Sequence, residues 1–80
     1  MLEAIRMPKL HELDEYEIVR FHKQVGDIVK RGDFFLDARL FDGSERPVAF
    51  YVNGTITEIN AKIGACVSED DLLGVVDDGQ

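Results

Sequence analysis

The sequence repeats itself over most of its length, and this repeat restricts the fold more than any other feature. Residues 16–38 align with residues 54–76 without a gap, at an offset of 38. Glycine falls on glycine and aspartate on aspartate, and both residue types have defined roles in turns. The clearest matches are Gly26 with Gly64, Asp33 with Asp71, and Val29 with Val67. We therefore expect one domain, residues 1–80, built from two copies of one unit about a pseudo-twofold axis.

Each half alternates short strand-forming runs with turns. In the first half, residues 17–21 include β-branched and aromatic side chains, and glycine-aspartate turns follow at 26–27 and 32–33. No segment has the sustained apolar period of a helix. The sequence predicts an all-β fold in which two four-stranded antiparallel sheets pack face to face. The expected strands are residues 2–7, 16–21, 28–30, 34–40, 47–52, 55–60, 66–68 and 72–77.

Apolar residues of these strands and their turns form the expected core. It comprises Ile5, Ile18, Phe21, Val25, Val29, Phe35, Val48, Ile56, Ile59, Ile63, Val67, Leu72 and Val75. Cys66 is the single cysteine, so no intrachain disulfide can form. We expect Cys66 to be a small core residue. A lone thiol is typical of reducing compartments, so a cytoplasmic location is expected.

The chain is acidic, with a net charge of −7 over 80 residues. Nucleic acids and anionic membrane surfaces attract proteins with a cationic face, so neither is an expected partner. The longest apolar runs, such as residues 72–76, are far shorter than the roughly 20 residues of a membrane span. The acidic surface favours solubility, or attraction to a basic patch on a partner protein.

No residue pattern indicates catalysis or metal binding. His11, His22 and Cys66 lack a metal-ligand spacing. The aspartate pairs at 70–71 and 77–78 lack the alternating ligands of a calcium loop, and neither Ser44 nor Ser68 lies in a nucleophile motif. We therefore predict that the protein is not an enzyme, with no catalytic and no metal-binding residues.

Five segments carry a family resemblance through their order and spacing. They are Met7-Pro8-Lys9-Leu10, Glu17-Ile18-Val19-Arg20-Phe21, Val25-Gly26-Asp27-Ile28-Val29-Lys30-Arg31-Gly32-Asp33, Val52-Asn53-Gly54-Thr55-Ile56 and Ile63-Gly64-Ala65-Cys66-Val67. Together they resemble the biotinyl/lipoyl attachment domain family over residues 7–77. The resemblance implies a flattened barrel-sandwich hybrid. It also implies a protruding hairpin between the halves, here residues 36–48.

This hairpin lacks the residue through which the family works. Members of the family carry lipoate or biotin on a lysine of the exposed turn, within Asp-Lys-Ala or Met-Lys-Met. Counting forward from the turn at 32–33 places that position on Asp42, and counting back from the turn at 53–54 places it on Gly43. Neither side chain has an amine that a ligase could acylate.

The chain differs from the family in more than this one position. No lysine occurs between Lys30 and Lys62, and an arginine cannot substitute because its guanidinium stays protonated. No cofactor is therefore expected. Tyr16 also departs from the family, which often has a glycine at the start of the second strand.

These observations predict an unmodified lipoyl/biotinyl-like domain that serves as a protein-interaction or scaffold module. The candidate partner-binding residues at the hairpin tip are Phe41, Asp42, Gly43, Ser44, Glu45 and Arg46, since aromatic and arginine side chains are frequent at interfaces. A solvated turn without a partner is the simpler interpretation of the same residues. Two other functions stay open: a carrier modified at another lysine such as Lys30 or Lys62, and a lipoyl-like module of a larger enzyme or export adaptor.

Overall fold

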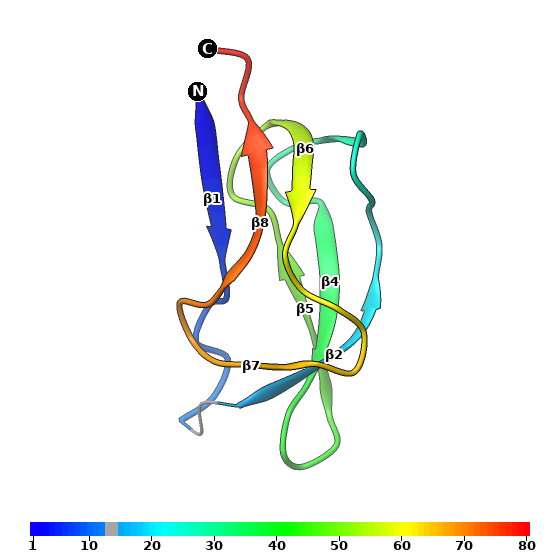
Figure 1. The fold of residues 1–80 in the computed structure, drawn as a ribbon. Helices are drawn as coiled ribbons and strands as arrows, with labels where there is room; N and C mark the ends of the chain where they lie inside the picture. Colours follow the sequence, from blue (N-terminus) through cyan, green and yellow to red (C-terminus); the bar gives the residue numbers. More distant parts are fainter. Residues whose placement is uncertain (13–14) are drawn as a thin grey trace.

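All regular structure in the described part of the chain is β-strand. The computed structural model describes residues 1–12 and 15–80 and contains eight strands in that part (Figure 1). They are β1 (Leu2–Arg6), β2 (Tyr16–Phe21), β3 (Ile28–Val29), β4 (Phe34–Arg39), β5 (Glu45–Ala49), β6 (Gly54–Ile59), β7 (Cys66–Val67) and β8 (Leu72–Asp77). Seven strands match the expected bounds to within one residue.

The exception is β5, which was expected at residues 47–52. It starts earlier because the turn that precedes it is tight. It also ends earlier, because Phe50 bonds with a turn instead of with β4. The Phe50 amide donates to the carbonyl of Asp33, and the Phe50 carbonyl accepts from Gly32, each over 2.8 Å.

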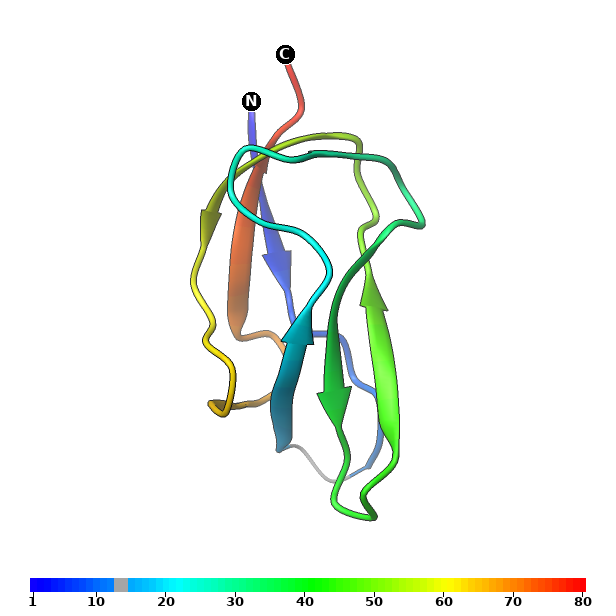
Figure 2. The same cartoon turned by 90° about the vertical axis from the view of Figure 1, so that its right-hand side faces the viewer.

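The strands form two antiparallel four-stranded sheets, in the orders β1-β8-β6-β3 and β5-β4-β2-β7. Figure 2 shows the sheets packed face to face, which confirms the expected all-β sandwich. The molecule is elongated, with extents of 39 × 19 × 19 Å. The chain termini lie at one end of the long axis and the β4–β5 hairpin lies at the other (Figure 1).

The two sheets use equivalent contacts from the two halves of the repeat. The Gly26 amide donates to the Ile56 carbonyl, and the Gly64 amide donates to the Ile18 carbonyl, each over 2.8 Å. The pairing of β2 with β4 is irregular at one point, and the pairing of β6 with β8 is irregular at the equivalent point. Each half therefore completes the other half's sheet, as a pseudo-twofold arrangement requires.

The core lies between the sheets and contains most of the expected residues. Ile5, Ile18, Val29, Phe35, Val48, Ile56 and Val67 are buried, and Phe21, Ile59 and Val75 are partly buried. Buried residues that the sequence interpretation missed are Met7, Tyr16, Leu36, Ala38, Leu40, Phe50, Leu73 and Val76.

Val25 and Ile63 were wrongly assigned to the core, since they are 57% and 66% exposed. Each is the second residue of a β-turn. In the first turn the Asp27 amide donates to the Gln24 carbonyl over 3.0 Å, and the equivalent bond of the second turn measures 3.1 Å. A side chain at this position projects away from the sheets, so apolar character does not place it inside.

Leu72 and Cys66 were also wrongly assigned to the core, because both side chains are exposed. Leu73, not Leu72, points inward at the start of β8. The register of β1 against β8 is irregular here. The irregularity shifts by one residue which side chains of β8 point inward. Within the short strand β7, Val67 is the buried residue, which leaves Cys66 on the outer face.

Candidate functional site

The hairpin tip is a tight turn whose backbone is closed by hydrogen bonds. The Leu40 amide donates to the Ser44 carbonyl over 2.8 Å, and the Gly43 amide donates to the Leu40 carbonyl over 3.0 Å. Gly43 has φ of 87°, a left-handed conformation that favours glycine over residues with a side chain. The position has open space around it, since nothing lies within 4 Å of a Cβ placed there.

Asp42 holds the tip together through its carboxylate. Its Oδ1 accepts hydrogen bonds from the Ser44 amide at 2.9 Å and from the Ser44 hydroxyl at 2.6 Å. The Ser44 hydroxyl, followed by the Ser44 amide, lowers the pKa of the Asp42 carboxyl below its usual value. Asp42 and Gly43 therefore both serve the geometry of the turn.

Tyr16 fixes the segment beside the tip. Its ring is buried, with 1% of the residue exposed. Its hydroxyl accepts from the Leu10 amide at 3.0 Å and the His11 amide at 2.9 Å, and donates to the His11 carbonyl at 3.0 Å. Sequence reasoning noted Tyr16 only as a departure from the family. The available signal was that a buried tyrosine hydroxyl usually needs a polar partner.

An aromatic contact joins this segment to the hairpin. The rings of His11 and Phe41 meet edge to face, with centroids 4.9 Å apart. Phe41 is still 65% exposed, whereas its neighbour Leu40 is buried. At the tip, the exposed ring of Phe41 therefore lies next to a residue, Leu40, that is anchored in the core.

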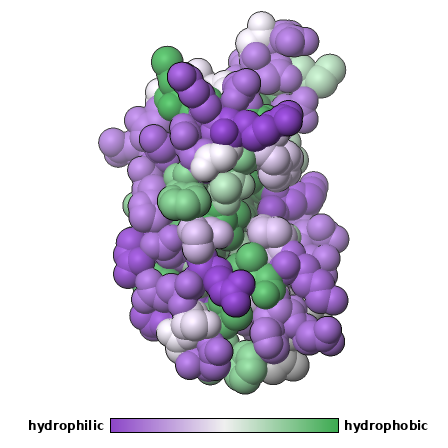
Figure 3. Space-filling model, turned by 180° about the vertical axis from the view of Figure 1, so that it is seen from behind, coloured by the Kyte–Doolittle hydropathy of each residue, from purple (hydrophilic) through white to green (hydrophobic). Residues whose placement is uncertain are grey.

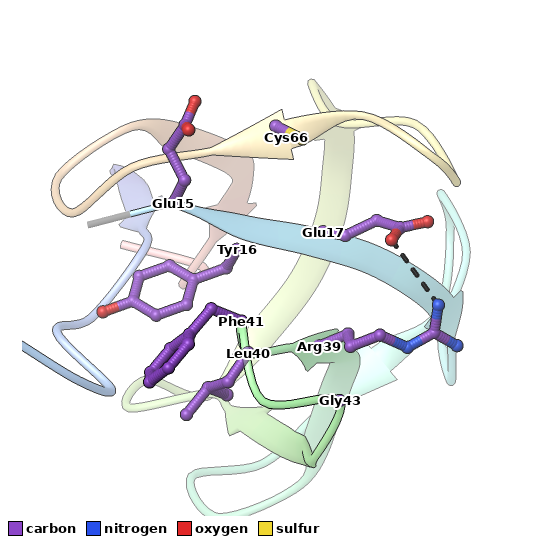
Figure 4. Close-up of a pocket in the computed structure, with 8 residues that line it drawn as sticks. All are labelled: Glu15, Tyr16, Glu17, Arg39, Leu40, Phe41, Gly43 and Cys66. Carbon is purple, nitrogen blue, oxygen red and sulfur yellow. Dashed lines mark hydrogen bonds and ion pairs between the residues drawn. The ribbon is translucent and has the colours of Figure 1, made fainter. Parts of the chain in front are cut away.

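A depression of about 300 Å³ lies beside the tip and is called the tip depression here. Its lining residues are Glu15, Tyr16, Glu17, Arg39, Leu40, Phe41, Gly43 and Cys66. Figure 4 shows the aromatic rings and Leu40 together, with the carboxylates of Glu15 and Glu17 pointing elsewhere. Of the six tip residues predicted from sequence, only Phe41 and Gly43 line this depression.

The other tip residues have different surroundings. Glu45 belongs to β5 and faces the neighbouring strands, with Arg20 at 2.7 Å and Arg39 at 3.6 Å. The hydrogen bond from Arg20 lowers the pKa of the Glu45 carboxyl. Arg46 is exposed and forms no ion pair with residues 1–12 or 15–80.

An ionic network that the sequence interpretation did not predict covers the outer face of the β5-β4-β2-β7 sheet. Besides its contact with Glu45, Arg20 contacts Asp37, whose other oxygen lies 3.0 Å from His22 Nε2. Burial raises the pKa of the Asp37 carboxyl, but hydrogen bonds from His22 and Arg20 outweigh burial, so the net shift is downward. Figure 3 views this side of the molecule, where hydrophilic side chains predominate and apolar ones reach the surface in separate spots.

Comparison with solved structures gives the family of the fold. The chain is similar to the lipoyl domain of the 2-oxoglutarate dehydrogenase complex from Azotobacter vinelandii, with 28% sequence identity and a TM-score of 0.74. The match covers 96% of this chain and 98% of that domain. The chain is a lipoyl/biotinyl attachment-like domain. No protein-family model matches this lipoyl-like domain, and neither does any curated protein sequence.

The described lipoyl-like domain offers no alternative site of known chemistry. Within residues 1–12 and 15–80, no three histidine, cysteine, aspartate or glutamate side chains are grouped as a metal ion would require. No helix in that part is long and apolar enough to cross a membrane.

Acidification is expected to lower the stability of this lipoyl-like domain. The folded-state pKa values of Asp37, Asp42 and Glu45 lie below their ordinary values of 3.8, 3.8 and 4.5. Below about pH 5 the unfolded chain therefore binds protons that the folded state does not, which favours unfolding. The contribution is present above that pH and is lost as pH falls through the folded-state pKa values.

Urea denaturation at about pH 6 and about pH 3.5 measures this loss. Asp37→Asn is the matched variant, because it removes one titrating group of the network. We expect a smaller drop in the urea midpoint for the variant than for the wild type. Equal drops in the two proteins would contradict the assigned role of the network.

Proposed function

We propose that this lipoyl-like domain is an unmodified, non-enzymatic module that binds a protein partner through its hairpin tip. One observation carries the proposal: no lysine occurs between Lys30 and Lys62, and counting from the flanking turns puts the family's lysine position on Asp42 or Gly43. A lipoyl or biotinyl carrier needs an amine at the tip for the amide bond to its cofactor. Asp42 is engaged with Ser44 instead, and Gly43 sets the turn.

The tip has features that suit a docking surface. Phe41 is exposed, and aromatic side chains often dominate binding energy at interfaces. The turn and the adjacent segment are tied by hydrogen bonds, so little conformational entropy would be lost on binding. The termini lie at the opposite end, so attachment to other domains would leave the tip accessible (Figure 1). The position of the termini is also compatible with the alternative function, a module within a larger enzyme or export adaptor.

The proposed setting is the cytoplasm, because a single cysteine forms no intrachain disulfide. Nucleic acid and anionic membranes are not proposed as partners, since the net charge is −7. The proposed partner is a protein.

Co-expression with a lipoate ligase and a biotin ligase tests the unmodified state. We expect the intact mass of the purified domain to equal the mass of its sequence. A lipoyl domain with a tip lysine serves as the positive control and gains cofactor mass under the same conditions. A lipoyl or biotinyl adduct on this chain would contradict the proposal.

One observation favours a carrier modified elsewhere as the second candidate. Lys9 lies two residues before His11, whose ring contacts Phe41. Lys30 and Lys62 lie in turns outside the hairpin. Lys9→Arg, Lys23→Arg, Lys30→Arg and Lys62→Arg variants identify the acceptor if an adduct is found, because the responsible variant loses the added mass.

A further inference from the structure

The tip depression combines apolar surface with acidic side chains. Its apolar part consists of the buried Leu40, the ring of Tyr16 and the exposed ring of Phe41 (Figure 4). Its volume of about 300 Å³ lies at the lower end of small-molecule sites. This size suits a side chain of a docked peptide better than a larger cofactor.

The acidic side chains outnumber the basic ones around this surface. Arg39 is already shared between Glu17 at 3.5 Å and Glu45 at 3.6 Å. Glu15 also lines the depression, is exposed, and forms no ion pair with residues 1–12 or 15–80. Glu45 does not line the depression and also pairs with Arg20 at 2.7 Å, so Glu15 is the charged lining residue left without an ion pair among the described residues, within a chain of net charge −7. A partner with complementary charge must be cationic at this place.

Resting on the proposed function, we propose that the tip depression binds a protein segment in which arginine or lysine flanks an apolar side chain. The apolar side chain packs against the exposed ring of Phe41, and the basic side chain pairs with the carboxylate of Glu15, because Glu17 is already paired with Arg39. Burial of the apolar group supplies affinity, whereas the charges supply selection against acidic segments. The inference deepens the docking role of the tip by stating the chemistry of its partner.

The probe is a short synthetic peptide of alternating arginine and leucine, titrated into isotope-labelled protein and followed by amide NMR. We expect saturable shifts at residues 15–17, 39–43 and 66, which line or adjoin the depression. A matched peptide with glutamate in place of each arginine is expected to show no saturation up to about 1 mM. Equal binding of both peptides, or shifts confined to other surfaces, would overturn the proposal.

Two pairs of variants separate a specific site from general attraction to an acidic protein. Phe41→Ala is expected to raise the half-saturating concentration about ten-fold, equivalent to about 1.4 kcal/mol. Phe34→Ala is its control, because Phe34 is also exposed but does not line the depression. Glu15→Gln is expected to raise the concentration about three-fold, and the exposed Glu58 of β6 provides the control Glu58→Gln.

An equal rise in the half-saturating peptide concentration for a variant and its control would also overturn the proposal. Unchanged spectra away from the tip verify that each variant is folded. A negative peptide titration would not contradict the proposed function. The proposed function is contradicted by a cofactor adduct on the chain, and that measurement does not depend on which peptide binds.

Discussion

Replacing Tyr16 by alanine is expected to lower the free energy of unfolding by about 3–4 kcal/mol, since it removes a large buried side chain. The residue is only 1% exposed and belongs to the core cluster. The expected loss is a large share of the stability of an 80-residue domain, which is on the order of 4–12 kcal/mol. Urea denaturation measures the change.

Tyr16→Phe separates the hydroxyl from the ring. It keeps the packing and removes the three hydrogen bonds to Leu10 and His11, so a loss of about 1–2 kcal/mol is expected. Faster amide exchange at residues 10 and 11 should accompany the loss. Tyr51→Phe is the control, because Tyr51 is 49% exposed and its hydroxyl donates one bond, to the Ala4 carbonyl at 2.7 Å. Equal losses for the two tyrosines would contradict the role assigned to Tyr16.

Gly54→Ala is expected to cost about 3–5 kcal/mol, because steric overlap and backbone strain add. A Cβ at this position would lie 2.2 Å from the carbonyl oxygen of Asp77 and 2.7 Å from Val76 Cγ1. The φ of Gly54 is 155°, a conformation that residues with side chains rarely adopt. The backbone of β8 cannot yield without breaking the pairing of β6 with β8.

The control for this change is Gly26→Ala. Gly26 also has a positive φ, of 96°, but nothing lies within 4 Å of its Cβ position. Only backbone strain is expected there, costing about 1 kcal/mol. Urea denaturation of the two variants therefore isolates the steric part. If Gly54→Ala lowered the free energy of unfolding no more than Gly26→Ala does, β6 and β8 would be less closely packed than described.

The strands were predictable because local chemistry determines them. Turn residues such as Gly26 and Gly64 mark where strands end, and the repeat shows each boundary twice. The position of the family's lysine was also counted between two turns, on Asp42 or Gly43, and stays a prediction. These features depend on residues near one another in the sequence.

Some errors arose where a side chain's surroundings depend on distant segments. Val25 and Ile63 are apolar, but their place in a turn exposes them. The same limit hid the contact between Arg20 and Glu45, since it needs the registers of three strands.

The assignment of Leu72 to the core was an error that was avoidable from the sequence. The repeat aligns Leu72 with the exposed Phe34, and it aligns Leu73 with the buried Phe35.

The candidate site was predictable only in part. Phe41 was identified as an exposed tip residue, and the structure places it at the depression. Glu15, Glu17 and Cys66 were not identified, because they line the depression only when β2 pairs with β4 and β7 pairs with β2. Tyr16 was noticed without its function, since its hydrogen-bond partners belong to the connection between β1 and β2.

The most direct test of the central claim is the intact mass of the native chain, captured together with its partner from the cells that produce it. We predict the mass of the bare sequence on the captured protein. We also predict a partner that is lost with Phe41→Ala and retained with Phe34→Ala. A lipoyl or biotinyl group on any lysine of the chain would contradict the account, since the domain would then be a carrier.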